Sequence, residues 1–336
     1  MKLSIGIVGL PNVGKSTLFK ILTRQEVHIA NYPFATIDPN VGVVTVPDER
    51  LEKLSALSKS KKTVPAVVEF YDIAGLVKGA NKGEGLGNQF LAHIRETQAI
   101  IIVIRLFSNS EIVHVEGTVD AVRDLEIINT ELILKDLETV EKCIPKAESE
   151  ARTGSKEAVQ FLPILREAKS ALEKGELLSA EKHSNILQNV GMSGLSLLTA
   201  KKQIYLLNGK EEDASGALLG KIKSLGADYL VMDLASATEI SLLIKKSYEI
   251  LDLISFLTTG EDETRAWTIK KGMKAPEAAG VIHTDFEKKF IRAEVVNWQK
   301  LLEAGSWVQA KQKGLIRLEG KEYVMQDGDV VVIRHG

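Results

Sequence analysis

Short apolar runs alternate with helix-compatible stretches over much of the chain. Continuous apolar runs are typical of strands that are buried on both faces in a parallel sheet. We expect such strands at residues 3–8, 41–46, 64–71, 99–106, 203–207 and 228–234, and helices at 15–24, 48–58, 88–97, 214–224 and 239–253. Strands that alternate with helices in this way predict an α/β fold.

A different pattern fills the middle of the chain. Residues 119–152 are highly charged, with Ile133, Leu137, Val140 and Ile144 spaced by four, three and four, which is a coiled-coil seam. A break at 153–155 precedes a second apolar stripe at 158–172. We expect two antiparallel helices, serving either as a docking arm or only in packing, since an apolar seam names no partner.

The last part, residues 254–336, contains short β-like segments around one helix-like piece with the sequence P-E-A-A-G. This predicts a small α+β module. The predicted organisation is therefore a sheet domain from residues 1–118 and 200–253, a helical insertion from 119–199, and a C-terminal domain from 254–336.

Composition excludes several classes. The 336 residues include 43 basic and 45 acidic side chains, a net charge of −2, which gives no general attraction to nucleic acid or to an anionic membrane. A single cysteine, Cys143, excludes an intramolecular disulfide. No apolar run approaches the roughly 20 residues of a membrane span, and the N-terminus runs directly into a predicted strand. We expect a soluble, cytoplasmic protein that contacts no membrane.

The stretch G-L-P-N-V-G-K-S, residues 9–16, has the form of a phosphate-binding P-loop. Its glycines allow a tight turn whose N–H groups converge on phosphate oxygens at the start of a helix. Lys15 would reach the outer phosphates, and Ser16 offers a hydroxyl to Mg²⁺, which prefers oxygen ligands. The sequence therefore predicts a magnesium–triphosphate site.

Further positions fit a nucleotide switch. Thr36, in the loop N-Y-P-F-A-T-I-D-P-N, would close over the metal, and Asp72, at the end of a predicted strand, would bind it through water. The Gly75 amide would contact the terminal phosphate. Ras-like hydrolases orient the attacking water with a glutamine where this chain has Leu76, so we expect hydrolysis to be slow or assisted by another group.

The segment Asn208-Gly209-Lys210-Glu211 follows a predicted strand and replaces the guanine-reading pattern N-K-x-D by N-x-x-E. Its glutamate is displaced by one methylene and fits guanine poorly, whereas the Asn208 carbonyl would accept from the adenine amine. The segment favours ATP over GTP, and GTP remains the alternative.

Several stretches together closely resemble the YchF or Obg-like ATPase family over essentially the whole chain. They are the P-loop, the loop at 31–40, D-I-A-G-L-V-K-G-A-N-K-G-E-G-L-G-N-Q-F-L, H-V-E-G-T-V-D, R-A-W-T-I-K-K-G, and A-A-G-V-I-H-T-D-F-E-K-K-F-I-R-A-E-V. The resemblance implies a P-loop domain, an inserted coiled coil and a C-terminal TGS domain of β-grasp form. It also implies a slow, Mg²⁺-dependent hydrolase that prefers ATP to GTP.

The resemblance also assigns residues and partners. It matches Asn12, Val13, Gly14, Lys15, Ser16 and Thr17 to the phosphate loop, Ser16 and Thr36 to magnesium, and Asn208, Gly209 and Glu211 to base reading. His114 matches a position thought to assist hydrolysis, although a lone histidine is more often structural; we take it and Lys15 as the catalytic pair. The implied partner is the ribosome, as the large subunit or whole particle, with RNA contact through the helical and TGS domains of a monomer.

Three departures limit this transfer. Ala35 replaces a cysteine found in many relatives, which excludes thiol regulation there. Gly209 leaves less apolar cover over the base, and residues 237–253 are shorter than in relatives. The C-terminal part has 13 basic and 12 acidic residues, so its composition alone does not favour RNA. A ribosome-associated GTPase, and a nucleotide-gated binding protein without meaningful turnover, remain as alternative hypotheses.

Overall fold

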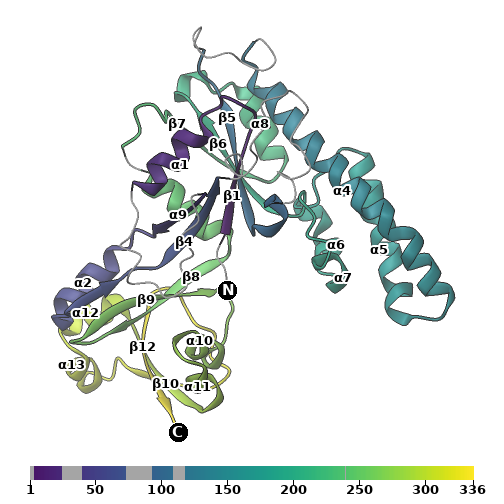
Figure 1. The fold of residues 1–336 in the computed structure, drawn as a ribbon. Helices are drawn as coiled ribbons and strands as arrows, with labels where there is room; N and C mark the ends of the chain where they lie inside the picture. The colour runs from purple at the N-terminus through teal and green to yellow at the C-terminus, as the bar shows by residue number, and fades with distance from the viewer. Residues whose placement is uncertain (1–3, 25–39, 73–92, 109–117, 239) are drawn as a thin grey trace. The chain divides into compact units, whose positions relative to one another are not determined.

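The computed structural model describes residues 4–24, 40–72, 93–108, 118–238 and 240–336 (Figure 1). These residues form two compact units. The sheet unit comprises residues 4–24 and 40–42 together with the described residues of 69–240. The C-terminal unit comprises residues 43–68 and 241–336.

A six-stranded sheet carries the N-terminal strand, in the order β2-β4-β1-β5-β6-β7. Its strands are β1 (Ser4–Val8), β2 (Val41–Thr45), β4 (Val67–Asp72), β5 (Ala99–Arg105), β6 (Lys202–Asn208) and β7 (Asp228–Met232). The neighbouring pairs β4–β1, β1–β5, β5–β6 and β6–β7 are parallel. Every residue of β1 and β5 is buried, as a strand covered on both faces requires. The predicted α/β sheet is confirmed.

The register of this sheet gathers polar residues at one edge. Ile7 of β1 lies opposite Asp72 of β4, and Arg105 of β5 lies opposite Asn208 of β6. Because these strands are parallel, their carboxyl ends meet along a single edge, which is where open α/β sheets bind ligands. The helices α1 (Lys15–Thr23) and α8 (Gly216–Ser224) begin beyond the ends of β1 and β6.

Two long helices form an antiparallel hairpin, the helical arm (Figure 1). α4 (Ala121–Arg152) is capped by Asp120 and α5 (Lys156–Glu173) by Ser155. Ion pairs of 2.9 Å between Lys169 and Glu141 and 2.8 Å between Arg166 and Glu148 fix the antiparallel direction. The short helices η3 (Glu181–His183), α6 (Ser184–Leu187) and α7 (Val190–Ser193) follow. In the described part of the chain, no helix has the length and apolar character to cross a membrane.

A buried carboxylate attaches the arm to the sheet. Asp136, fully buried on α4, accepts hydrogen bonds from the backbone N–H groups of Leu198 and Thr199 at 2.9 and 2.7 Å. The Thr199 hydroxyl donates a third bond at 2.7 Å. Burial raises the pKa of Asp136, and these donors oppose the shift. The arm is thereby held to the segment that leads into β6.

The second sheet, in the C-terminal unit, has the order β11-β10-β12-β8-β9-β3. Its strands are β3 (Lys62–Val64), β8 (Leu253–Thr259), β9 (Glu263–Lys270), β10 (Phe290–Asn297), β11 (Arg317–Glu319) and β12 (Asp329–His335). The helices of this unit are α2 (Glu49–Ser58), α9 (Ser241–Ile250), α10 (Ala275–Ile282), α11 (Thr284–Lys288), α12 (Trp298–Ala304) and α13 (Trp307–Gln312). The α+β character expected for this part of the chain is confirmed.

Two details differ from expectation. The predicted strand 64–71 is two strands, because Pro65 lacks the N–H that would continue a ladder. β3 pairs with β9, so a segment from the first quarter of the chain completes the C-terminal sheet. The predicted helix 239–253 ends at Ile250, and β8 begins within three residues of it. The three domain boundaries given above remain predictions.

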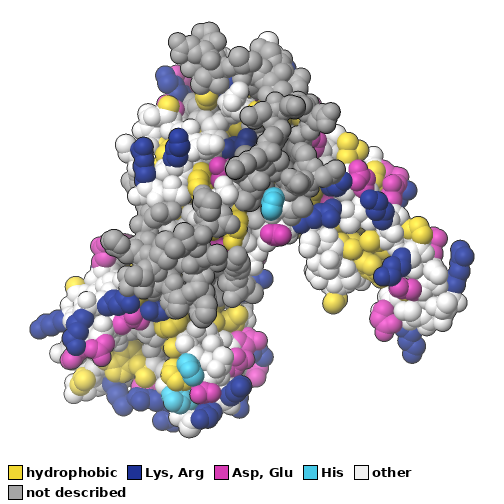
Figure 2. Space-filling view, viewed as in Figure 1, with side chains coloured by type: hydrophobic (Ala, Val, Ile, Leu, Met, Phe, Trp, Pro, Cys, Tyr) yellow, Lys and Arg dark blue, Asp and Glu magenta, His cyan; other side chains and the backbone are white. Residues whose placement is uncertain are grey.

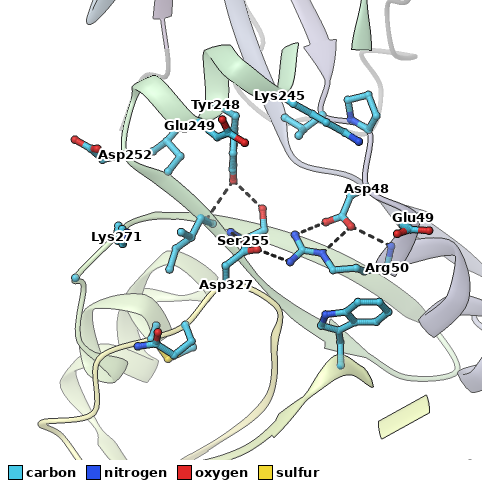
Figure 3. Close-up of a pocket in the computed structure, with 18 of the residues that line it drawn as sticks. Asp48, Glu49, Arg50, Lys245, Tyr248, Glu249, Asp252, Ser255, Lys271 and Asp327 are labelled. Carbon is cyan, nitrogen blue, oxygen red and sulfur yellow. Dashed lines mark hydrogen bonds and ion pairs between the residues drawn. The ribbon is translucent and has the colours of Figure 1, made fainter. Parts of the chain in front are cut away.

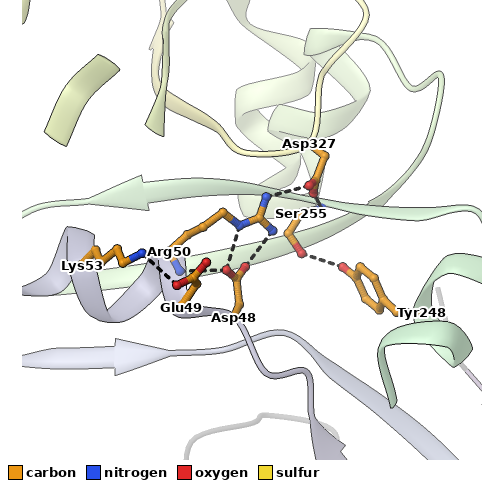
Figure 4. A network of polar contacts seen from close by, with 7 residues as sticks. All are labelled: Asp48, Glu49, Arg50, Lys53, Tyr248, Ser255 and Asp327. Atoms are coloured by element: carbon orange, nitrogen blue, oxygen red, sulfur yellow. Dashed lines mark hydrogen bonds and ion pairs between the residues drawn. The ribbon is translucent and has the colours of Figure 1, made fainter. Parts of the chain in front are cut away.

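An ion network joins α2 to the C-terminal sheet (Figure 4). Asp48, the N-cap of α2, accepts from Arg50 Nε at 2.7 Å and Nη2 at 2.8 Å. Arg50 Nη1 donates to Asp327 Oδ2 at 2.6 Å, and Asp327 Oδ1 accepts from the Ser255 N–H at 2.9 Å. These hydrogen bonds raise the pKa of Arg50 although burial opposes the shift. Arg50 therefore links three segments that are far apart in sequence.

We expect Arg50→Met to destabilise the C-terminal unit by about 2 kcal/mol, because it leaves the nearly buried Asp48 carboxylate without its cation. All three tryptophans, Trp267, Trp298 and Trp307, lie in this unit, so the fluorescence of the full chain during urea unfolding reports on it. Lys61→Met, which breaks a highly exposed pair with Asp262, is the matched control and should change little. Equal midpoints for the two variants would contradict the assignment.

Candidate functional site

The loop between β1 and α1 has the shape that its glycines permit. Asn12 and Gly14 have φ of 61° and 107°, in the left-handed region. A Cβ atom on Gly14 would lie 2.4 Å from the Asn208 side-chain nitrogen, so no other residue fits without a shift. Asn12, Ser16 and Thr17 are exposed, whereas Val13 is buried. The loop therefore offers backbone and hydroxyl groups on its outer side.

Lys15 lies beneath this loop. It is 9 % exposed, and its ammonium donates to the backbone carbonyls of Gly9 at 3.0 Å and Leu10 at 2.6 Å. Burial lowers the pKa of Lys15 to about 8, and the charge of Asp72 opposes that shift. Phosphate oxygens would supply the negative charge that this buried ammonium lacks.

This environment makes triphosphate binding depend on pH. A bound triphosphate favours the charged ammonium and raises its pKa, so affinity is full below pH 8 and falls as pH rises through the free-state pKa of about 8. Between pH 7 and pH 9 we expect a loss of about tenfold, measured by calorimetric titration. Lys15→Arg, which stays charged, should flatten the profile. A flat profile for the unaltered chain would contradict the role of Lys15.

Asp72 is the second polar group at this edge. It ends β4, is 7 % exposed, and its Oδ1 atom is buried with no hydrogen-bond partner among the described residues. A buried carboxylate oxygen without a donor fits a cation or its bound water. No cluster of three or more His, Cys, Asp or Glu in the described ranges resembles a metal cage. The residues thus fit Mg²⁺, which takes few protein ligands and keeps water and phosphate.

Asn208 braces the loop. Its side-chain nitrogen donates to the Val13 carbonyl at 2.8 Å, and its side-chain oxygen accepts from the Leu234 N–H at 3.1 Å. The carbonyl that we expected to accept from the adenine amine is therefore already engaged with the backbone. Asn208 is 3 % exposed, which fits a positioning role in this conformation. Its contact with a base remains a prediction.

The rest of the base-reading segment lies beside it. Gly209 is buried, and a Cβ atom there would lie 2.7 Å from Leu106 Cβ, so glycine allows the close approach of β5 and β6. Glu211 begins the exposed turn η4 (Glu211–Asp213). The register of the sheet thus brings Gly209 and Glu211 to the same edge as the phosphate loop.

Arg105, for which the motifs predict no role, is 1 % exposed at the end of β5. Its Nε donates to the Phe107 carbonyl at 2.9 Å, and its guanidinium lies 4.4 Å from the centre of the Phe107 ring. The sequence does carry a signal for this residue, because Arg105 is the charged residue that ends the otherwise apolar strand A-I-I-I-V-I-R. Arg105 adds a buried cation at the edge that carries Asp72 and Asn208.

Four predicted positions, Thr36, Gly75, Leu76 and His114, lie outside the described residues. Ala35 does as well. The structure therefore brings Lys15, Ser16, Asp72 and Asn208 to one edge of the sheet, and the role of each of these residues stays a prediction.

A cavity of about 880 Å³ in the C-terminal unit is the competing location (Figure 3). Its wall includes Arg50, whose guanidinium is already paired with two carboxylates. Lys245, Glu249 and Lys271 also line it, so its charges are of mixed sign. A triphosphate needs converging donors with excess positive charge. The phosphate loop, with the Lys15 ammonium beneath it, offers such donors, whereas the lining of this cavity does not.

Comparison with known proteins gives similarities along the whole chain. Residues 4–139 match the family described as "50S ribosome-binding GTPase", and residues 253–336 match the YchF-GTPase C-terminal family, described as "Protein of unknown function". A Bacillus subtilis protein named "Ribosome-binding ATPase YchF" is 48 % identical over 99 % of each chain. Its namesake from Escherichia coli O157:H7 is 42 % identical over 98 % of each. The solved structure of the Schizosaccharomyces pombe YchF GTPase has a TM-score of 0.86 and 39 % identity, covering 99 % of this chain and 98 % of that one.

Proposed function

The chain belongs to the YchF family, and from this membership we propose that it is a magnesium-dependent P-loop nucleoside triphosphatase that prefers ATP to GTP and binds the ribosome. The observation that carries the proposal is the position of Lys15, buried beneath the phosphate loop, beside a buried carboxylate oxygen of Asp72 that has no described partner. Structural loops seldom bury one charge and leave another without a donor.

Each residue of the site has a proposed role. The backbone N–H groups of Asn12 to Thr17 hold the phosphates, and Lys15 neutralises the charge that develops on the transferred group. Ser16, Thr36 and Asp72 hold Mg²⁺, which when bound screens the charge of the phosphates. Gly75 senses the terminal phosphate, and His114 assists the attack of water, since the aliphatic Leu76 cannot orient it.

The preference for ATP over GTP can be decided by a competition titration. Asn208, Gly209 and Glu211 frame the base, and an N-x-x-E segment lacks the spacing with which N-K-x-D satisfies guanine. We expect ATP to displace a fluorescent nucleotide at lower concentration than GTP does, with Mg²⁺ present. Tighter binding of GTP would instead establish a ribosome-associated GTPase.

Ribosome binding is proposed from the names of the relatives. We propose a cytoplasmic monomer that binds the large subunit or the whole ribosome, with RNA contact through the helical arm and the C-terminal unit. Gradient co-sedimentation with separated subunits in ATP, in ADP and without nucleotide tests this. Absence from every ribosomal fraction in all three states would reject it.

A nucleotide-gated binding protein with negligible turnover is the second candidate, and Leu76 favours it because no glutamine orients water there. Phosphate release distinguishes the two. Marked stimulation by ribosomes would support the hydrolase, whereas release at background with ribosomes present would support the binding protein.

A further inference from the structure

Three chain segments meet at the amino ends of β5 and β6, which is the edge of the sheet opposite the phosphate loop. Ala99, the first residue of β5, lies opposite Lys202, the first residue of β6. Residues 93–97 lead into β5 and residues 198–201 lead into β6, so the parallel pairing places these two segments side by side. The third segment is the root of the helical arm, around Asp136 of α4.

Lys201 joins the first two segments. Its ammonium donates to the backbone carbonyl of Arg95 at 3.0 Å and to that of Thr97. Burial lowers the pKa of Lys201 to about 8, and the charge of Asp136 opposes that shift. A partly desolvated ammonium is destabilised when its acceptors leave, because little water replaces them. Lys201 therefore holds the segment before β6 to the segment before β5.

Arg95 joins the first segment to the arm. Its Nη2 donates at 2.6 Å to the Thr139 hydroxyl, which lies on α4 about one turn beyond Asp136. Because Asp136 accepts from the N–H groups of Leu198 and Thr199, each of the three segments is bonded to the other two. We call this ring of hydrogen bonds the polar lock, and its members are Arg95, Thr97, Asp136, Thr139, Leu198, Thr199 and Lys201.

The polar lock acts on backbone groups. Its bonds end on two carbonyls before β5 and on two N–H groups before β6. Hydrogen bonds are directional, whereas apolar packing is not. A displacement of residues 93–97 alone would take the acceptors from Lys201, and a displacement of residues 198–201 alone would take the donors from the fully buried Asp136. Because either loss is costly, we expect the three segments to move as one body.

The first of these segments lies downstream of the proposed phosphate sensor. The chain that leaves Gly75 next enters the described structure at His93, in the helical turn 93–96, and reaches β5 through the polar lock. In nucleotide switches, the segments that contact the terminal phosphate rearrange when that phosphate is lost. A rearrangement that extends to His93 is therefore passed to the root of the arm.

Long-range electrostatics offer a poor alternative route from the nucleotide to the arm. Figure 2 shows basic and acidic side chains next to each other on the visible face of the arm. The effects of exposed charges of mixed sign cancel with distance, and salt screens them further. The described contacts thus favour a mechanical route, which runs through the polar lock.

We propose that the polar lock couples the helical arm to the nucleotide: loss of the terminal phosphate displaces residues 93–97, and the lock passes this displacement to residues 198–201 and to the root of α4. The inference rests on the proposed function, because Gly75 must sense the phosphate. Arg95 and Lys201 are positioning residues, since they lie at the edge of the sheet opposite the phosphate loop.

Hydrogen exchange of the full-length chain, followed by mass spectrometry, tests this coupling. The chain is studied with Mg²⁺ and saturating β,γ-imido-ATP, with Mg²⁺ and saturating ADP, and without nucleotide. The reporters are the amides of Leu198 and Thr199, because their exchange requires the bonds to Asp136 to open. We expect exchange to be slower with the triphosphate than with ADP by about fivefold or more, the lower end of usual coupling between sites. Residues 150–156, at the far end of the arm, should exchange equally in both.

A double variant cuts the lock at its first segment. R95M/K201M removes both ties of residues 93–97 and leaves the bonds of Asp136 in place. The difference between the two nucleotides at the reporter amides should vanish, while the triphosphate still protects the amides of the phosphate loop. R166M/K169M is the matched control, because it removes the same residue types from ion pairs within the arm, and it should retain the difference.

A milder pair of variants tests the tie between Arg95 and α4 by itself. Thr139→Val keeps the branched shape but removes the hydroxyl that accepts from Arg95, so the difference between the nucleotides should shrink. Thr139→Ser keeps the hydroxyl and should retain it. A joint that serves only in packing would give both variants the same ratio of exchange rates. Thermal melting establishes that each variant is folded.

The outcomes distinguish the inference from the function on which it rests. Equal exchange of the reporter amides with both nucleotides, in an unaltered chain whose phosphate loop is protected, would overturn the coupling alone. A difference that survives in R95M/K201M would overturn the role of the polar lock. If neither nucleotide protects the phosphate loop, the proposed function fails and the coupling fails with it.

Discussion

Replacing Lys15 by alanine is expected to lower kcat/KM for triphosphate hydrolysis by about 10²–10³-fold, the usual effect of removing one preorganised charge from a transition state. The ammonium is held in place by the carbonyls of Gly9 and Leu10, so its geometry is set before the nucleotide arrives. Loss of the cation also leaves Asp72 without its nearby positive charge. Steady-state phosphate release, measured over a range of ATP concentrations, gives kcat/KM for each variant.

The matched control is Lys20→Ala. Lys20 lies in the last turn of the same helix, α1, and is exposed, so this variant removes an equal charge away from the loop. It should hydrolyse ATP at close to the original rate. Lys15→Ala with unchanged activity, or an equal loss in Lys20→Ala, would show that Lys15 has no special place in the reaction.

The second large effect is expected on the Mg²⁺ requirement of hydrolysis when Asp72 is replaced. Asp72→Asn keeps the volume but removes the charge, and the Mg²⁺ concentration for half-maximal activity should rise by about 10–100-fold, as for residues that hold a metal through its bound water. The buried Oδ1 atom without a described partner is the physical reason, because an amide binds Mg²⁺ and its water less strongly than a carboxylate does. Hydrolysis is measured against Mg²⁺ at saturating ATP.

Glu69→Gln is the control for that experiment. Glu69 lies on the same strand, β4, and pairs with the Tyr71 hydroxyl at 2.7 Å, so the variant removes one carboxylate without reaching the site. Its Mg²⁺ dependence should match that of the unaltered chain. An Asp72→Asn enzyme with the original Mg²⁺ requirement would exclude Asp72 from the metal site.

Features that depend on local sequence were predictable. The apolar run before Arg105 is a fully buried strand because nothing polar interrupts it. Asp48 caps α2, which ends at Ser58 as expected, because a cap is decided within one helical turn. The pairing of α4 with α5 follows from the seam of Val140 and its neighbours, since each stripe needs an apolar partner.

Features that depend on distant partners were not predictable. Nothing within residues 62–64 indicates that β3 pairs with β9 rather than with a neighbouring strand. The side chain of Asn208 has donors and acceptors that suit a base equally well; only the folded backbone shows that Val13 and Leu234 use them. Arg292 and Arg334 likewise look like isolated surface charges until the register places them opposite each other.

The pairing of β3 with β9 also constrains how the chain is made. Lys62 leaves the synthesising ribosome roughly 200 residues before its partner Glu263. Until Glu263 is made, α2 lacks the C-terminal sheet, and its Leu51 and Leu54, which are buried in the folded chain, have no such sheet to pack against. Pairings so distant in sequence form slowly and expose apolar surface to aggregation meanwhile. The C-terminal unit therefore completes only near the end of synthesis, and residues 254–336 expressed as a separate fragment would present an uncovered strand edge at β9.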